Sequence, residues 1–208
     1  MARRLAPEVN AGSMADIAFL LLIFFLVSTT IETDYGISRK LPPPPDDLIS
    51  EMIVKEKNLF RVELNQVNAL FVEKKPMKLA NLKDAAIAFL DNGGGEAKET
   101  CHYCKGLRDP KSSDNPNRAV ISLINNRETN YETYIAVQNE LVSAYTELRN
   151  REALRLYGVS FTQMKENLKD INHSGDKERL KQRITEIKLM YPEKLSEAEP
   201  KESKSQKL

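Results

Sequence analysis

The stretch that decides the fold is residues 14–31, which read MADIAFLLLIFFLVSTTI. Sequence this dense in apolar residues occurs nowhere else in the chain, whose remaining composition is polar. A helix needs about 20 predominantly apolar residues to cross the hydrocarbon core of a bilayer, with a lower limit near 17. We therefore predict one transmembrane helix over residues 14–31, preceded by a short segment, residues 1–13.

A cleaved secretory signal is the competing interpretation, because Arg3 and Arg4 precede the apolar run. We favour a retained anchor, since the run is followed by STTIETDYG, which offers no small-x-small cleavage site, and a carboxylate, Asp16, stands at its head. The two arginines place the N-terminus in the cytoplasm by the positive-inside rule. Everything after residue 31 then lies outside, in the periplasm of a bacterium with two membranes or in a eukaryotic lumen.

Residues 32–47 form the predicted linker after the anchor. Four consecutive prolines, Pro42 to Pro45, prevent helix or sheet here and favour an extended polyproline rod. Such a rod is a spacer of limited flexibility. The alternative to a spacer, an inert linker or a PxxP segment that docks a partner, is an equally good interpretation.

The following residues, 48–158, predict a small α+β domain. Short apolar runs predict two hairpin strands and one central strand, and apolar residues at helical spacing predict two helices. The strands are expected at 59–64, 69–72 and 119–124, and the helices at 81–90 and 131–157. A loop over 93–117, rich in Gly, Pro, Ser and Asn, is expected to lie outside the core.

Beyond Gly158 we predict a helical extension, residues 159–192. Ser160 to Gln163 has the form of a capping box, and apolar residues on one face predict a helix over 177–191. Residues 193–208 contain little apolar sequence, which predicts a disordered tail.

Asp16 is the residue whose position most clearly indicates a chemical role. A carboxylate near the end of a membrane helix is costly and usually faces a partner helix or a water-filled path. Because an apolar environment disfavours the charged form, such a group can take up and release a proton. The alternative is that Asp16 only caps the helix at the membrane interface. Position alone does not choose between the two.

The surrounding residues add a resemblance. Glu8, Val9 and Asn10 form an acidic-apolar-Asn triplet whose Asn precedes Asp16 by six residues, and Asp16 opens a Leu/Ile/Phe-rich helix. This pattern, close over about residues 7 to 45, resembles the N-terminal signature of the ExbD/TolR family of biopolymer transport proteins. The order of predicted elements in residues 48–158 is similar to that family's small periplasmic domain.

The resemblance implies a function in the bacterial inner membrane. It implies a subunit that pairs with a second copy of itself inside a ring of ExbB-like polytopic proteins, where Asp16 takes up protons driven by the proton-motive force. The work would pass to a TonB-like protein; a Tol-type envelope-maintenance motor is one alternative, and a membrane-tethered scaffold without a proton role is another. Asn10, Ser13 and Thr29 are candidates to support the proton path, although hydroxyls in membrane helices more often bond their own backbone.

Cys101 and Cys104 form a CxxC within the predicted loop and are the only cysteines. A local disulfide is the simplest interpretation in an oxidising periplasm. Half of a metal site is a second, but one CxxC supplies only two thiolates. A thioredoxin-like redox centre is a third, although the pair lacks the preceding strand and following helix of that motif.

Charge and motifs argue against other classes of function. The 31 basic and 30 acidic residues nearly balance, which gives no bulk attraction to nucleic acid. Nucleotide-binding P-loop, GxSxG and HExxH motifs do not occur. We therefore expect no enzymatic activity, no cofactor and no metal.

Overall fold

The computed structural model describes residues 11–28, with side chains as far as Leu26, and residues 54–198. The chain divides into two units, Met1–Ser50 and Glu51–Leu208, and each is described by itself. Residues 1–10, the predicted linker 32–47 and the predicted tail beyond residue 198 lie outside the described residues.

The first unit contains helix α1 (Ala11–Ser28). The large apolar side chains that the structure describes on it, between Met14 and Leu26, are all exposed, from Ile23 at 41% to Leu26 at 72%. The predicted transmembrane range, residues 14–31, continues past Ser28 into residues that are not described. Among the residues whose side chains the structure describes, no helix has the length and apolarity needed to cross a membrane.

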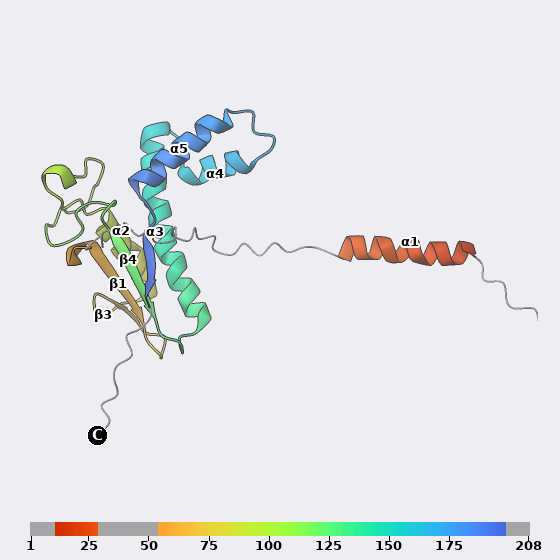
Figure 1. Ribbon diagram of the computed structural model, residues 1–208, viewed down its shortest axis with the longest axis horizontal. Helices are drawn as coiled ribbons and strands as arrows, with labels where there is room; N and C mark the ends of the chain where they lie inside the picture. Colours follow the sequence, from red (N-terminus) through yellow and green to blue (C-terminus); the bar gives the residue numbers. More distant parts are fainter. Residues whose placement is uncertain (1–10, 29–53, 199–208) are drawn as a thin grey trace, which may run out of the picture. The chain divides into compact units, whose positions relative to one another are not determined.

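The second unit is built on a five-stranded mixed sheet (Figure 1). The strand order is β3-β2-β1-β4-β5. Neighbouring strands are antiparallel in β1–β2 and β2–β3 and parallel in β1–β4 and β4–β5. The strands are β1 (Leu59–Leu64), β2 (Leu70–Val72), β3 (Lys75–Pro76), β4 (Val120–Asn125) and β5 (Leu195–Ala198).

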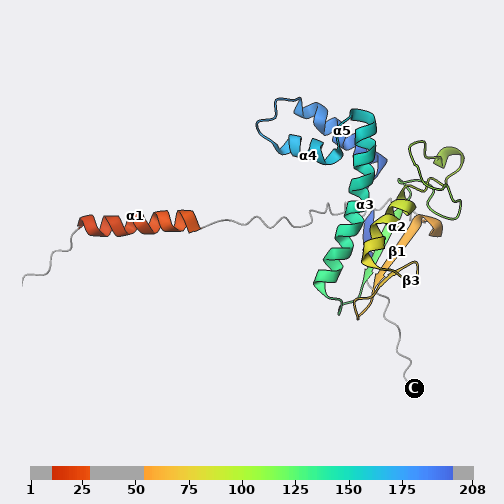
Figure 2. The same cartoon turned by 180° about the vertical axis from the view of Figure 1, so that it is seen from behind.

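Helices connect the parallel strands, as parallel pairing requires long crossovers. The helix α2 (Leu82–Leu90) lies between β1 and β4 in the chain, and α3 (Tyr131–Tyr157), α4 (Phe161–Lys169) and α5 (Lys177–Met190) lie between β4 and β5. Short 3₁₀ turns are η1 (Glu56–Asn58), η2 (Leu79–Asn81) and η3 (Ala97–Glu99). Both views show α2 and α3 on the same face of the sheet (Figures 1 and 2).

The main core lies between this face of the sheet and the two helices. In β1 every second residue is buried, the period of a strand with one covered face. Phe60 of β1 stacks on Phe89 of α2, with ring centroids 5.0 Å apart. The α3 stripe buries Leu141, Tyr145 and Leu148 against the same core, as the helical spacing predicts.

A second, smaller core joins the end of α3 to α4 and α5. It contains Ala153, Phe161, Met164, Ile184 and Ile187. Gly158 ends α3 in the left-handed conformation, with φ at 69°. The Ser160 hydroxyl accepts a hydrogen bond from the Gln163 backbone, so Ser160 is the N-cap of α4, which is one half of the predicted capping box.

The α+β class and all five elements predicted between residues 48 and 158 are confirmed, with α3 at the predicted bounds. The prediction that residues 193–208 are disordered is wrong for residues 195–198, which form β5 in parallel register with β4. Leu195 packs against the main core, and the Glu197 carboxylate accepts hydrogen bonds from Tyr134 and Gln138 of α3. Because β5 completes the sheet, the α4–α5 pair is an insertion within the domain and not an addition behind it.

Candidate functional site

Asp16 lies on α1, where it is the only ionisable residue. Its side chain is exposed. Residues three and four positions apart share one face of a helix, so Ser13 and Leu20 lie on the same side as Asp16. The structure therefore places the Ser13 hydroxyl one turn from the carboxylate, while Asn10 and Thr29 lie outside the described residues.

The first half of α1 is rich in small residues. Ala11, Gly12, Ser13, Ala15 and Ala18 surround Asp16 along the helix. Small side chains let neighbouring helix backbones approach closely in a membrane. A partner helix packed on this half would enclose the Asp16 carboxylate, whereas the Leu/Ile/Phe-rich second half suits contact with lipid.

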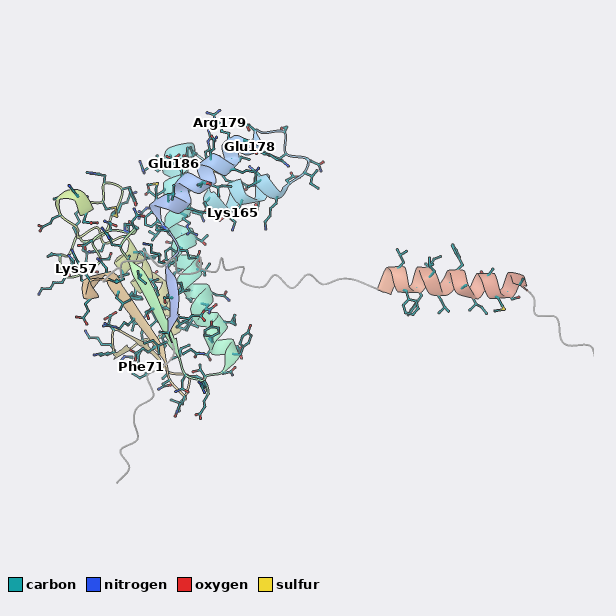
Figure 3. The ribbon with its side chains drawn as sticks, viewed as in Figure 1. Lys57, Phe71, Lys165, Glu178, Arg179 and Glu186 are labelled. Carbon is teal, nitrogen blue, oxygen red and sulfur yellow. A yellow bond between two sulfur atoms is a disulfide. The ribbon has the colours of Figure 1, made fainter. Side chains whose placement is uncertain are left out.

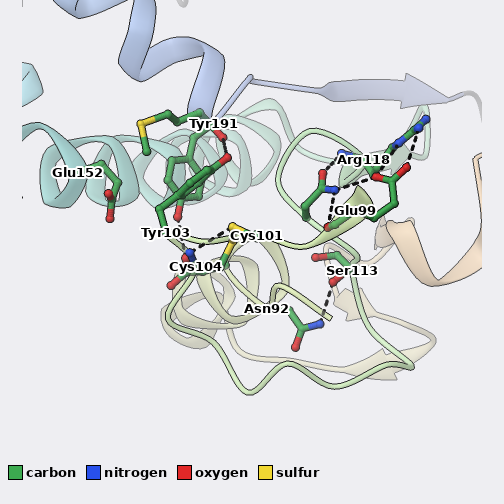
Figure 4. The surroundings of a disulfide bond; sticks show 12 residues. Asn92, Glu99, Cys101, Tyr103, Cys104, Ser113, Arg118, Glu152 and Tyr191 are labelled. Carbon is green, nitrogen blue, oxygen red and sulfur yellow. Dashed lines mark hydrogen bonds and ion pairs between the residues drawn. A yellow bond between two sulfur atoms is a disulfide. The ribbon is translucent and has the colours of Figure 1, made fainter. Parts of the chain in front are cut away.

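The second candidate region is the loop of residues 93–117, here called the disulfide loop, which connects α2 to β4. Cys101 and Cys104 are joined by a disulfide bond, and the Cys104 amide donates a 3.1 Å hydrogen bond to Cys101 Sγ (Figure 4). Both cysteines are buried. Because both sulfur atoms are in the disulfide, neither is a thiolate that could ligate a metal ion. Within residues 11–28 and 54–198, no three acidic, His or Cys residues lie close enough together to hold a metal ion.

Asn92 fixes the base of the disulfide loop. Its amide nitrogen donates to the backbone oxygens of Asp109 (2.9 Å) and Ser113 (2.8 Å), and its side-chain oxygen accepts from the Asp109 amide (3.0 Å). Figure 4 shows Asn92 pointing toward Ser113. Because one buried side chain satisfies several backbone groups, the two arms of the loop are held together without an apolar core.

The expectation that this loop lies outside the core is wrong for its middle part. Tyr103 packs against the main core, and Cys101 and Cys104 are 2% and 6% exposed. Gly93 permits this packing: its φ is +67°, and a Cβ there would lie 2.8 Å from Cys104 Cβ. A side chain at residue 93 would therefore be strained and would collide with the disulfide.

Asp114 ties the other arm of the loop to η1. Its carboxylate pairs with Lys57 Nζ at 2.5 Å and accepts a 2.9 Å hydrogen bond from the Asn58 side chain. Burial by itself would raise the pKa of Asp114, but the hydrogen bonds from Lys57 and Asn58 and the charges of Lys57 and Lys55 outweigh it and lower that pKa.

Tyr191, which follows α5, joins this loop to α2 and α3. Its hydroxyl donates a 2.6 Å hydrogen bond to Asp91, and Arg151 binds the Asp91 carboxylate through two bonds of 2.6 and 2.8 Å. Burial, followed by the hydrogen bond to Asp91, raises the pKa of the Tyr191 hydroxyl. Burial also raises the pKa of the Tyr103 hydroxyl to about 12, so both tyrosines are neutral at physiological pH.

Two further charged residues of α3 are buried beside this network. Glu152 is fully buried and pairs with Arg151 (3.1 Å) and Arg155 (2.6 Å). Arg149 donates two hydrogen bonds, of 3.0 and 2.8 Å, to the Tyr191 backbone oxygen. Each buried charge has an opposite charge or a carbonyl oxygen against it, as burial of ions requires. The network links α2, α3 and the segment after α5, and its one pair of a hydroxyl with a carboxylate, Tyr191 with Asp91, is buried away from solvent.

Sequence reasoning did not identify the network around Tyr191. One signal was present: Glu152 lies on the buried stripe of α3, four positions after Leu148, and is preceded directly by Arg151. A carboxylate on a buried stripe requires a partner. No local pattern indicates that Asp91 and Tyr191, 100 positions apart, supply the other half of the network.

Comparison with models of protein families gives a match over most of the chain. The family model described as biopolymer transport protein ExbD/TolR matches residues 2–151, which is most of the chain. The match includes α1, the whole sheet except β5, and the disulfide loop. None of the curated proteins matches the chain.

Proposed function

The chain belongs to the ExbD/TolR family of biopolymer transport proteins, and from this membership we propose that it is the proton-coupled subunit of a motor that powers transport at the outer membrane. Members of the family are inner-membrane subunits that transduce energy in systems of the ExbB–ExbD–TonB or Tol–Pal type and are not enzymes. The observation that carries the proposal is Asp16, the single carboxylate on the otherwise apolar α1, inside the matched region.

The proposed topology has one membrane anchor. Residues 14–31 cross the inner membrane, with Arg3 and Arg4 on the cytoplasmic side and the domain from Glu51 onward in the periplasm. The exposed apolar side chains of α1 support this arrangement, because water-exposed phenylalanine and leucine over a whole helix require an apolar surrounding. The linker with Pro42 to Pro45 would then hold the domain away from the membrane surface.

In the proposed mechanism Asp16 carries one proton at a time. In a ring of ExbB-like proteins, a neutral Asp16 tolerates an apolar surrounding and an ionised Asp16 requires a polar one, so loading and release of the proton shift the preferred position of α1. One elementary charge crossing the membrane potential supplies about 2.3 kcal/mol per 100 mV. A sizeable mechanical step therefore needs several protons, which fits a subunit that works with a second copy of itself.

A TonB-like protein is the proposed recipient of this work, and a Tol-type system is the alternative within the family. The test is growth of cells that carry Asp16→Asn on a nutrient that requires energised uptake across the outer membrane. Asp16→Glu, which keeps a titratable carboxyl, is the matched control. Membrane level and co-purification with the ExbB-like partner are measured for both variants.

We expect Asp16→Asn to abolish this growth while assembly stays intact, and Asp16→Glu to retain part of it. Wild-type growth of Asp16→Asn together with wild-type resistance to detergent would overturn the proton mechanism and leave a membrane-tethered scaffold as the better hypothesis. Normal nutrient uptake combined with new sensitivity to detergent would assign the chain to a Tol-type system.

A further inference from the structure

The turn between α4 and α5, residues 170–176, carries a motif that the proposed transport function does not use. Asn172, His173 and Ser174 form the pattern N-x-S, and no other asparagine of the chain is followed two residues later by Ser or Thr. N-x-S/T, with any residue except Pro in the middle, is the acceptor motif for attachment of a glycan to the asparagine side chain. Because three residues make a short motif, its place in the structure decides whether it can be used.

The structure places this motif at the free end of the α4–α5 pair. Both views show the turn at the end of the pair that points away from α3 and the sheet (Figures 1 and 2). Asn172 and Ser174 are both exposed. An exposed turn at the end of two helices can enter the active site of a large enzyme without unfolding of the domain.

Two aspartates hold the ends of the turn and leave the side chain of Asn172 free. Asp170 accepts a 2.9 Å hydrogen bond from the Asn172 backbone amide, and Asp176 accepts one of 3.0 Å from the Glu178 amide at the start of α5 (Figure 3). The Asn172 carboxamide and the Ser174 hydroxyl have no hydrogen-bond partner among the described residues. Both groups are therefore available to an enzyme, and the fold requires neither of them.

The residue before the motif, Ile171, has a side chain that is 89% exposed. A sugar attached to Asn172 would lie beside it and remove part of this apolar surface from water, which is favourable. The turn therefore gains from a glycan, and the glycan breaks no side-chain hydrogen bond of Asn172.

We propose that Asn172 is a site of N-linked glycosylation. The donor is a saccharide carried on a polyprenyl diphosphate, and the catalyst is an oligosaccharyl transferase that recognises the Ser174 hydroxyl. A C–N bond forms between the Asn172 carboxamide nitrogen and the anomeric carbon of the first sugar. The bond from that carbon to the diphosphate oxygen breaks, the polyprenyl diphosphate leaves, and the nitrogen releases one proton.

The modification rests on the topology of the proposed function, because N-x-S/T sites are glycosylated in domains that lie outside the cytoplasm. It does not depend on Asp16 or on proton coupling. The proton mechanism can therefore fail without affecting this proposal.

The test uses the full-length protein, purified from the membranes of the cells that naturally make it. Cleavage after Lys and Arg releases residues 170–177 as one peptide, because Lys169 and Lys177 flank the motif. Asn172 is the only asparagine of this peptide. Tandem mass spectrometry of the peptide measures the mass of an attached sugar and the residue that carries it.

Three variants and one internal control define the site. Asn172→Gln removes the acceptor, Ser174→Ala removes the recognised hydroxyl, and Ser174→Thr, the matched control, keeps a hydroxyl. Asn139 is equally exposed, on α3, but lies outside any such motif. We expect a sugar on Asn172 in the wild type and in Ser174→Thr, its loss in Asn172→Gln and in Ser174→Ala, and no sugar on Asn139.

Three results would overturn the proposal. They are an unmodified wild-type peptide, a sugar that persists in Asn172→Gln and is therefore carried by Ser174, and a sugar that persists unchanged in Ser174→Ala.

The topology is measured separately, with a membrane-impermeant amine reagent applied to cells whose outer membrane alone is permeabilised. Lys165 of α4 is an exposed lysine that reports on the side of the membrane (Figure 3). A labelled Lys165 together with an unmodified peptide would overturn the glycosylation site alone. An unlabelled Lys165 would overturn the periplasmic placement as well, and with it the proposed function.

Discussion

Tyr103 and Tyr191 pack edge to face with ring centroids 5.4 Å apart, and the Tyr103 hydroxyl donates a 2.7 Å hydrogen bond to the Met190 oxygen. Tyr103 lies between the two cysteines of the disulfide, and Tyr191 connects α5 to β5. This contact therefore fastens the disulfide loop to the segment that leads into the last strand of the sheet. Four predictions concern this loop and the network beneath it.

The first prediction concerns Tyr103 itself. Tyr103→Phe should lower the free energy of unfolding by about 1 kcal/mol, because it leaves the Met190 oxygen without its donor. Tyr103→Ala should cost about 3 kcal/mol, because the ring contact is lost as well. Urea unfolding measures both. Tyr131→Phe, at an exposed tyrosine, is the control and should have no effect; equal losses for Tyr103→Phe and Tyr131→Phe would contradict the assigned hydrogen bond.

The second prediction concerns the disulfide. Replacing both Cys101 and Cys104 by Ala should lower the free energy of unfolding by about 2 kcal/mol, since the bond closes only a short loop. A reductant should destabilise the wild type by a similar amount and leave the double variant unchanged. Growth that depends on Asp16 should survive the double replacement. Its loss, with the protein folded and at normal level, would support a redox role for this pair.

The third prediction concerns the buried ion pair of Asp91 and Arg151. Asp91→Ala should destabilise the domain by about 3 kcal/mol, because the Tyr191 hydroxyl loses its acceptor and Arg151 loses one of its two carboxylate partners. The exposed pair of Lys83 and Glu147 is the control, and Glu147→Ala should leave the free energy of unfolding unchanged. A double-mutant cycle with Arg151→Gln should show strong coupling; additive effects would mean that the pair does not act as a unit.

The fourth prediction concerns the pH dependence of stability. The pKa of Asp114 is lower in the folded domain than its ordinary value of 3.8, so the folded state favours the ionised form. Its contribution to stability should be complete above about pH 5 and should fall as the pH drops through 3.8 and below. Free energies of unfolding measured from pH 3 to 7 should therefore differ most between the wild type and Asp114→Asn near pH 7. A difference that grows toward pH 3 would contradict this sign.

The sequence predicted the regular elements well where apolar residues repeat at the period of a strand or a helix. Apolar and polar residues alternate from Phe60 to Leu64, and α3 carries a continuous apolar stripe that ends at a glycine, so β1 and α3 were predictable from sequence. β5 was not predictable. It has four residues with a single core contact, Leu195, and it becomes a strand only because β4 offers it an edge.

The candidate sites also differ in how far the sequence predicts them. Asp16 is recognisable from sequence because a carboxylate within an apolar run is unusual wherever the run is placed, and the cysteine pair is recognisable because the chain has no other cysteines. The contacts that hold the disulfide loop were not predictable. Asn92, Asp114 and Tyr191 have no distinctive sequence pattern, and each bonds a residue far from it in the chain.

The sequence by itself determined the apolar helix with its one acid and the α+β class, because both follow from local composition and spacing, and the residues around Asp16 carried the resemblance to the family. Only the tertiary structure decided that the disulfide loop is fastened to the core and that α4 and α5 are inserted before the last strand. The physical reason is that these features depend on hydrogen bonds and ion pairs between residues up to 100 positions apart, which no local pattern encodes.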